Sequence, residues 1–160
     1  EESGREVAAG MPSAQRLVLT GFMGAGKSTV GPRLASALGW IFADLDEAIV
    51  RAQRASIADL FASMGEQAFR ELELEALACA LQRAQIVLAL GGGVLESAAS
   101  RSLLTNDPNS LMVYLEAPLE ELLARCDGQQ LSQDGAPRRP VLEDRAKVAE
   151  RFLRRRHLYE

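Results

Sequence analysis

The order of apolar segments along the chain predicts a three-layer α/β/α fold, in which helices cover both faces of a parallel sheet. Short apolar runs that suit buried strands alternate with longer segments whose apolar residues recur every three or four positions. One short run, residues 85–90, is apolar almost throughout, which is typical of a strand buried on both faces. The first short run leads into a glycine-rich turn and then into a helical segment, so the chain begins its fold with a strand–turn–helix unit.

Each element has a local signature. Residues 16–20 are an apolar run that ends at the glycine turn, and they predict the first strand. Residues 27–38 have helical periodicity, and Gly39 follows as a C-terminal cap. Pro32 lies inside this helix, where proline costs stability unless it falls within the first turn or two. Residues 127–139 have no apolar periodicity and contain two glycines and a proline, so we expect a mobile loop there. The other strands are expected at residues 40–43, 85–90 and 111–115, and the other helices at residues 47–54, 57–63, 66–83, 97–104, 118–125 and 142–159.

Length and composition indicate one globular domain. The 160 residues are 48% hydrophobic and 25% charged, and they contain no run long enough to span a membrane. The net charge of −4 argues against a nucleic-acid partner, and no targeting leader is visible, so we expect a cytoplasmic protein. Residues 1–15 are polar and are expected to be a flexible leader before a domain at 16–160. Cys79 lies in an apolar helical pattern and is expected to be buried.

The turn after the first strand matches a phosphate-binding loop. Residues 21–28, GFMGAGKS, fit the pattern G-x-x-x-x-G-K-[ST] between a strand and a helix. Glycines let the backbone wind so that several N–H groups point at phosphate oxygens, and the following helix adds its positive end. Lys27 is expected on the β- and γ-phosphates of a nucleotide and Ser28 on magnesium.

Several polar residues follow the expected strands, where a doubly wound sheet binds its ligands. Asp44 and Asp46 end the second strand; they can hold magnesium or orient an acceptor hydroxyl, or they can cap a helix. The three glycines at 91–93 allow either close approach by a ligand or a tight turn. Arg70 and Glu73 are three residues apart on a helix, which suits a surface ion pair or an arginine that binds a substrate carboxylate.

Arginines dominate the end of the chain. Arg138 and Arg139 end the expected mobile loop, and they suit either a solvated basic loop or a cation that a closing loop carries to the transferring phosphoryl group. Residues 154–156 are three consecutive arginines on the last helix. Consecutive helical residues point in different directions, so at most one or two of them can face a site.

Taken together, these segments resemble the shikimate kinase family over about residues 17–159. The segments are residues 21–29 (GFMGAGKST), 44–46 (DLD), 56–61 (SIADLF), 65–70 (GEQAFR) with Glu73, 90–94 (LGGGV), 139–142 (RPVL) and 155–159 (RRHLY). The phosphate loop is common to many kinases, but the remaining set in this order is much more specific. The resemblance implies strand order 2-3-1-4, a fifth edge strand that this chain lacks, and a mobile lid at about residues 127–142.

The resemblance also implies a reaction and a site. The family transfers the γ-phosphoryl group of ATP, with Mg²⁺, to the 3-hydroxyl of shikimate, in aromatic amino-acid biosynthesis, and acts as a monomer. Asp46 would hold the acceptor hydroxyls, while Arg70 and Arg155 would clamp the shikimate carboxylate. The complete acceptor site would be Asp46, Phe61, Phe69, Arg70, Glu73, Gly91, Gly92, Gly93 and Arg155.

The nucleotide site implied by the resemblance lies on the loop and the lid. Lys27, Asp46 and Arg139 would be the catalytic residues, with Ser28 and Asp44 at the metal. The ATP-binding set would be Gly24, Ala25, Gly26, Lys27, Ser28, Thr29, Arg125 and Arg139. Two alternatives stay open on the residues alone. One is a related kinase for another small acceptor such as gluconate, and the other is a catalytically silent nucleotide-binding module.

Overall fold

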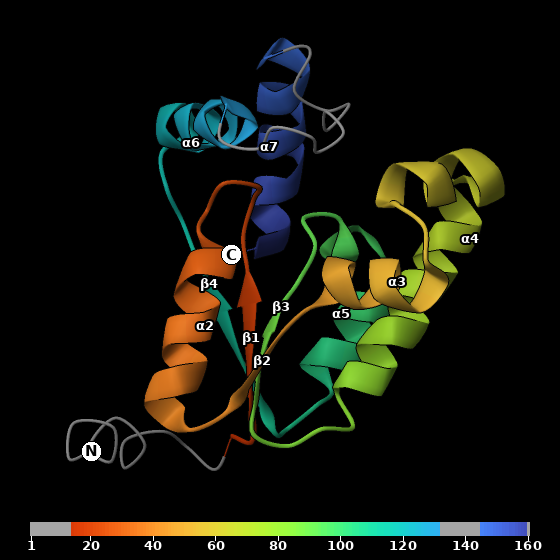
Figure 1. Cartoon of the computed structure of the whole chain (residues 1–160), viewed down its shortest axis with the longest axis vertical. Coiled ribbons are helices and arrows are strands. Elements are labelled where there is room, and N and C mark those ends of the chain that lie inside the picture. The colour runs from red at the N-terminus through yellow and green to blue at the C-terminus, as the bar shows by residue number, and fades with distance from the viewer. Residues whose placement is uncertain (1–13, 132–144, 160) are drawn as a thin grey trace.

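The computed structural model describes residues 14–131 and 145–159 and contains a four-stranded parallel sheet (Figure 1). The strands are β1 (Arg16–Thr20), β2 (Ile41–Asp44), β3 (Ile86–Ala89) and β4 (Ser110–Tyr114). Their order in the sheet is β2-β3-β1-β4, as predicted. All of the pairings are parallel, so the carboxyl ends of the strands lie at one edge of the sheet.

Helices cover both faces of this sheet, because both faces are apolar. In β1, Leu17 and Leu19 pack with Ala35 of helix α2 (Lys27–Leu38), while Val18 between them packs in the core on the other face. Alternate residues of a strand point to opposite faces, so one short strand contributes to two cores. In Figure 1, α2 lies on one side of the sheet, and α3 (Leu45–Gln53), α4 (Ile57–Ala80) and α5 (Ala98–Thr105) lie on the other. The predicted three layers are therefore confirmed.

The remaining helices lie beyond the carboxyl ends of the strands. A short 3-10 helix, η1 (Val94–Glu96), follows the glycines after β3, and α6 (Leu119–Leu131) and α7 (Arg145–Tyr159) lie at the top of Figure 1. Val148 and Phe152 of α7 join the larger of the two cores. None of the helices in the described ranges is long and apolar enough to cross a bilayer.

The largest differences from the sequence-based expectation lie at the ends of α4 and α6. The break expected between helices at 57–63 and 66–83 is present, because Gly65 within α4 is not helical (φ 81°, ψ 170°), but the second part ends at Ala80. The expected loop at 127–139 starts later, because α6 continues to Leu131. One glycine inside a helix costs only about 1 kcal/mol, so Gly128 does not end it. Residues 132–144, the rest of the predicted lid with Arg138 and Arg139, lie outside the described residues.

Two smaller expectations are also wrong. Gln15, which was assigned to the leader, already belongs to the fold: its N–H donates to the carbonyl of Asn109 at 2.8 Å and its carbonyl accepts from Gln85 at 2.7 Å. Residues 1–13 lie outside the described ranges. Cys79 is exposed, because the buried stripe of α4 runs through Glu73 and Leu77 and leaves Cys79 on the outer side.

Candidate active site

The phosphate loop joins β1 to α2 at the carboxyl edge of the sheet. Gly21, Gly24 and Gly26 have φ values of 141°, 78° and 95°, a region in which residues with a side chain are strained. Gly26 is the N-cap of α2, and no side chain caps the helix. No side chain therefore competes with an anionic ligand at the start of α2, and a glycine-rich turn before a helix start suits the phosphates of a nucleotide.

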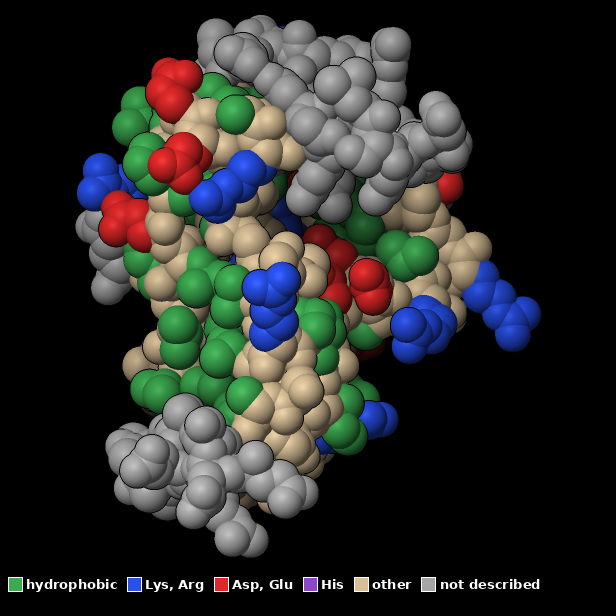
Figure 2. Space-filling model, turned by 60° about the vertical axis from the view of Figure 1, so that its left-hand side comes forward, with side chains coloured by type: hydrophobic (Ala, Val, Ile, Leu, Met, Phe, Trp, Pro, Cys, Tyr) green, Lys and Arg blue, Asp and Glu red, His purple; other side chains and the backbone are tan. Residues whose placement is uncertain are grey.

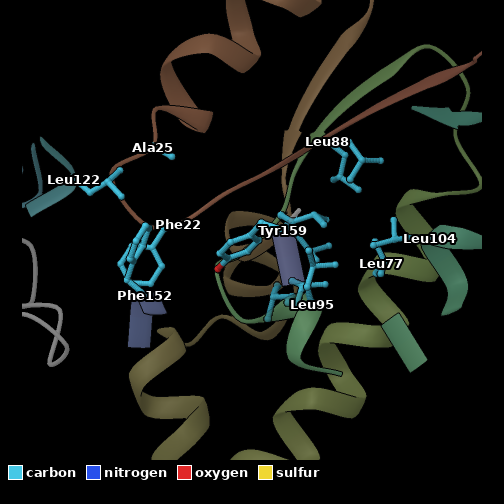
Figure 3. Packing of buried hydrophobic residues seen from close by; sticks show 14 of the residues in the cluster. Phe22, Ala25, Leu77, Leu88, Leu95, Leu104, Leu122, Phe152 and Tyr159 are labelled. Carbon is cyan, nitrogen blue, oxygen red and sulfur yellow. The ribbon is translucent and has the colours of Figure 1, made fainter. Parts of the chain in front are cut away.

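The loop is held by its own lysine and by the core. The ammonium of Lys27 donates to the carbonyls of Gly21 at 2.7 Å and Phe22 at 3.1 Å, so it lies over the loop. Phe22 is buried and its ring meets that of Phe152 edge to face, with centroids 5.3 Å apart (Figure 3). Helix α7 is thereby packed directly against the phosphate loop.

Ser28 and Asp44 come together as predicted for a metal site. The Ser28 hydroxyl donates to Oδ2 of Asp44 at 3.3 Å. The other oxygen, Oδ1, accepts the N–H groups of Asp46 at 3.0 Å and Glu47 at 3.3 Å, so Asp44 also caps α3. Asp44 thus caps α3, one of the roles that the sequence left open, while its metal role stays a prediction. A hydroxyl and a carboxylate side by side suit Mg²⁺, which takes one or two protein ligands together with water and phosphate oxygens. The described residues contain no group of three or more His, Cys, Asp or Glu that could hold a metal.

A cavity of about 1090 Å³ lies next to the loop, and Met23 of the loop forms part of its wall. All of the predicted acceptor-site residues line this cavity: Asp46, Phe61, Phe69, Arg70, Glu73, Gly91, Gly92, Gly93 and Arg155. They come from α3, α4, the segment after β3, and α7. Figure 2 shows the molecule from a side on which acidic side chains gather at a hollow of the surface. The sequence-predicted site is therefore one continuous space.

The three glycines form the floor of the cavity, and each lies under one side chain. A β-carbon on Gly91 would collide with the carboxylate of Asp46, and one on Gly93 would lie 2.7 Å from both Nη atoms of Arg70. A β-carbon on Gly92 would meet Nη1 of Arg155 at 3.6 Å, an ordinary contact. None of the three has a positive φ. They are glycines because functional side chains from three helices approach the backbone here.

Arg70 is fixed from two sides. Its Nη1 donates to Oε2 of Glu73 at 2.7 Å, and its Nη2 donates to Oε2 of Glu96 at 3.2 Å. The guanidinium carbon lies 5.8 Å from the ring centroids of both Phe61 and Phe69. Glu73 is almost fully buried, and desolvation raises its pKa although the hydrogen bond and charge of Arg70 oppose the shift. Arg70 and Glu73 are thus a buried pair on the cavity wall, and not a surface ion pair.

Of the three consecutive arginines on α7, only Arg155 is buried. Its Nη2 donates to Oε2 of Glu96 at 2.7 Å, and its buried Nε has no partner in the part of the chain that the structure describes. Arg154 and Arg156 are exposed and pair with Glu96 and Glu116, respectively. Arg155 therefore keeps capacity to bind an anionic ligand in the cavity.

Arg125 lies next to the phosphate loop, and its contact with the adenine stays a prediction. Its Nη1 contacts the carbonyl of Gly24 at 3.4 Å, and its Nη2 pairs with Glu121 at 2.9 Å on the same helix. The arginine is about half exposed, so it borders open space at the nucleotide side.

Sequence reasoning missed several residues of the site, among them Met23, Glu96, Arg151 and Tyr159. Arg151 lines the cavity four residues before Arg155, and this helical spacing was a usable signal. The Tyr159 hydroxyl donates to the carbonyl of Gly92 at 2.7 Å, and burial raises its pKa to about 12. Glu96 had no local signal, because its partners come from distant helices.

A phosphate-binding loop beside a cavity with a carboxylate on one wall and two arginines on another defines a P-loop kinase for a small anionic acceptor. The comparisons with known proteins agree. The model of the family described as shikimate kinase matches residues 23–160. A shikimate kinase of Salinibacter ruber is 42% identical over 154 residues, which are 93% of this chain and 74% of that protein. One of Streptomyces coelicolor is 45% identical and covers 92% and 82%.

Solved structures give the same result. The structure described as shikimate kinase from Acinetobacter baumannii in complex with shikimate has a TM-score of 0.80 at 35% identity, and covers 92% of this chain and 79% of that one. The shikimate kinase of Aquifex aeolicus has a TM-score of 0.74 at 30% identity, with coverage of 90% and 81%. This chain belongs to the shikimate kinase family and is a phosphotransferase.

Proposed function

We propose that this protein transfers the γ-phosphoryl group of ATP to the 3-hydroxyl of shikimate and releases ADP and shikimate 3-phosphate. The observation that carries the proposal is the cavity next to the phosphate loop, because Asp46, Arg70 and Arg155 all line it. A small polyol acid needs these two kinds of recognition: cations for its carboxylate and acceptors for its hydroxyls. Membership of the shikimate kinase family supports the same substrate.

On the nucleotide side, the loop N–H groups and Lys27 hold the phosphates. Ser28 and Asp44 would hold Mg²⁺, which neutralises charge on the phosphate oxygens when it is bound. Arg125 lies at the nucleotide end of the loop. Arg139 lies outside the described residues, so its role as the arginine of the lid stays a prediction, as does the lid itself.

On the acceptor side, the guanidinium groups of Arg70 and Arg155 bind the shikimate carboxylate, and this fixes the ring in the cavity. Asp46 accepts a hydrogen bond from the reacting hydroxyl and orients its oxygen toward the phosphorus. The transition state of phosphoryl transfer is loose, so the hydroxyl needs little deprotonation early in the reaction. Asp46 therefore acts chiefly by orientation, and takes up the proton late.

The two alternatives are less well supported. A gluconate-like acceptor also carries a carboxylate, but the family model and the relatives name shikimate kinases. A silent module would not need a complete phosphate loop beside a cavity that contains Asp46, Arg70 and Arg155. The expectations of a monomer and of a cytoplasmic location stay predictions.

The test is ADP release from MgATP with shikimate, gluconate, AMP or no acceptor. We expect turnover with shikimate only, and phosphorus NMR should locate the product phosphate on the 3-hydroxyl. The matched control is Lys27→Ala, which should lose turnover while the far-UV circular dichroism spectrum stays unchanged. Turnover with gluconate and none with shikimate would contradict the proposal.

A further inference from the structure

Glu96 is bonded to both arginines of the acceptor site. Its Oε2 accepts from Arg155 at 2.7 Å and from Arg70 at 3.2 Å, so two guanidinium groups from α7 and α4 meet at one oxygen atom. Its Oε1 accepts from Arg154 at 2.9 Å. Burial would raise the pKa of this carboxyl, but the hydrogen bonds and charges of Arg155, Arg154 and Arg70 outweigh burial and lower it. Glu96 is therefore a carboxylate at the centre of an arginine cluster.

Glu96 does not itself line the cavity. Both of its arginine partners do, together with Glu73 and Asp46. Glu96 thus contacts the two guanidinium groups from outside the space that the acceptor would occupy.

The backbone that carries Glu96 is also held. Glu96 ends η1, and its N–H donates to the carbonyl of Gly93 at 3.0 Å. Nη1 of Arg101 in α5 donates to the carbonyl of Leu95 at 2.6 Å and to that of Glu96 at 3.0 Å. The backbone of Glu96 is therefore fixed directly after the three glycines, and its carboxylate holds both arginines relative to that backbone.

The charge balance makes such a carboxylate necessary. Arg70, Arg151 and Arg155 line the same cavity, and the charges of Arg155 and Arg154 contribute to lowering the pKa of Arg151, after desolvation. Like charges in a partly buried site repel, and without a shared acceptor the long side chains would spread apart. Within the described ranges, Glu73 forms an ion pair with Arg70, whereas Glu96 pairs with both arginines of the proposed clamp and so joins them.

We propose that Glu96 is a positioning residue for the acceptor carboxylate, which holds Arg70 and Arg155 at the spacing and orientation that one carboxylate group requires. The proposal rests on the proposed function, since the clamp is useful only if the acceptor carries a carboxylate. Glu96 touches neither substrate nor nucleotide, and acts entirely through the two arginines.

The experiment compares steady-state kinetics of the full chain and its variants with shikimate and MgATP. Glu96→Gln keeps the shape but removes the charge, and the KM for shikimate should rise roughly tenfold, because hydrogen bonds to charged groups are worth about that factor or more. The kcat and the KM for ATP should each change by less than about threefold. Glu96→Asp keeps the charge but is one methylene too short to reach both arginines, so its KM should also rise.

Two further variants isolate the mechanism. Arg154→Gln breaks only the bond to the other carboxylate oxygen, on an exposed side chain, and should keep the KM for shikimate within about twofold of wild type. In an Arg155→Lys background, Glu96→Gln should add less to KM than it does in wild type, because the two residues act together.

The outcomes separate this inference from the function itself. If the wild-type protein does not phosphorylate shikimate, the proposed function fails. If it does, and Glu96→Gln has an unchanged or lower KM for shikimate, only the positioning role is overturned, because Glu96 would then merely weaken the field of the arginines. A Glu96→Asp variant with wild-type KM would overturn it as well, since charge alone would then suffice.

Discussion

The chemistry proposed for the acceptor site depends on the carboxylate of Asp46. It lies in the first turn of α3, above Gly91, and lines the cavity. Its backbone N–H is bonded to Asp44, so the metal-side carboxylate and the acceptor-side carboxylate share one helix start. Asp44 and Asp46 are two residues apart, so one can act at the metal while the other acts at the acceptor hydroxyl in the same phosphoryl transfer.

We predict that Asp46→Asn keeps more activity than Asp46→Ala. If Asp46 acts chiefly by orienting the hydroxyl, asparagine still offers an oxygen, and its kcat should fall by about tenfold, against about a hundredfold or more for alanine. Steady-state kcat at saturating shikimate and MgATP measures this. Equal losses in both variants would indicate that removal of the proton by the carboxylate is rate-limiting.

Tyr159 joins the last turn of α7 to the cavity floor. Its ring stacks on that of Tyr114, with centroids 5.5 Å apart and an interplanar angle of 17°, and its hydroxyl donates to the carbonyl of Gly92. Burial raises the pKa of the phenol to about 12, so it stays a hydrogen-bond donor at every pH at which the enzyme is assayed.

Tyr159→Phe should therefore lower the free energy of unfolding by about 1 kcal/mol, because a partly buried carbonyl loses its donor while the ring is kept. The KM for shikimate should rise a few-fold, since Gly92 forms part of the cavity floor. Urea unfolding and initial rates measure the two effects. An unchanged unfolding midpoint would show that the hydroxyl contributes nothing to the fold.

At the scale of elements, the glycine segment between β3 and η1 shows how closely side chains from other elements approach its backbone. Helices α3, α4 and α7 each send one side chain over it: Asp46, Arg70 and Arg155. Because none of these glycines needs a positive φ, alanine is allowed by the backbone at all three positions. Space alone decides what a substitution does.

This predicts a graded series of alanine variants. Gly93→Ala should push Arg70 off Glu73 and Glu96 and raise the KM for shikimate about tenfold, whereas Gly91→Ala should displace Asp46 and lower kcat instead. Gly92→Ala should be the mildest, because its new methyl meets Arg155 at an ordinary distance. Kinetics of the three variants under one set of conditions test this. The same kinetic defect in all three would contradict a separate partner for each glycine.

Helix α3 ends on an arginine in a conformation that glycine prefers. Arg54 is its C-cap, with φ 54° and ψ 32°, and it is exposed. The left-handed conformation costs an ordinary residue about 1–2 kcal/mol, and glycine avoids this although it loses more entropy on folding.

Arg54→Gly should therefore raise the free energy of unfolding by up to about 1 kcal/mol. The matched control is Ala48→Gly at an exposed position inside the same helix, which should lower it by about 1 kcal/mol. Urea unfolding of both variants beside the wild type gives the comparison. A loss of stability in both would mean that the cost of glycine in the unfolded chain dominates at the cap as well.

For the molecule as a whole, local signals were enough for the three layers, while the family resemblance supplied the strand order and much of the site. The run at 85–90 and the glycine loop after residues 16–20 are contiguous patterns, and the layers predicted from such patterns are confirmed, as is the strand order. Element ends were less accurate. The continuation of α6 to Leu131 and the end of α4 at Ala80 depend on small propensity differences that surrounding structure decides, whereas the break at Gly65 was predicted.

Sequence reasoning missed some residues of the site for a different reason. Glu96 is 26 residues from Arg70 and 59 from Arg155, so only the folded chain brings the three together. Cys79 was placed on the wrong side of α4, because alanines and cysteine are too small to fix the phase of a helix. In this protein, sequence reasoning could name the side chains proposed to bind substrate and nucleotide, but not the side chains that hold them in place.

The last prediction concerns the pH dependence of stability, to which the two carboxylates of the arginine cluster contribute with opposite signs. The pKa of Glu96 in the folded protein lies below its ordinary value of 4.5, so its contribution is present above pH 4.5 and is lost as the pH falls through the lower, folded pKa. The free energy of unfolding of Glu96→Gln should thus be lowest relative to wild type near pH 6–7, by about 1 kcal/mol or less because water screens a partly exposed group. Near pH 3 the two proteins should be about equally stable.

Glu73 contributes with the opposite sign. Its pKa is raised above 4.5 by burial, so protonation favours the fold, and that contribution is lost as the pH rises through the folded pKa. Relative to Glu73→Gln, wild type should lose stability as the pH rises from 4 to 7. Urea unfolding of the three proteins at pH 3.5, 5 and 7 gives both differences. If the stability difference between wild type and Glu96→Gln and that between wild type and Glu73→Gln changed in the same direction with pH, the opposite pKa shifts of the two carboxyl groups would be contradicted.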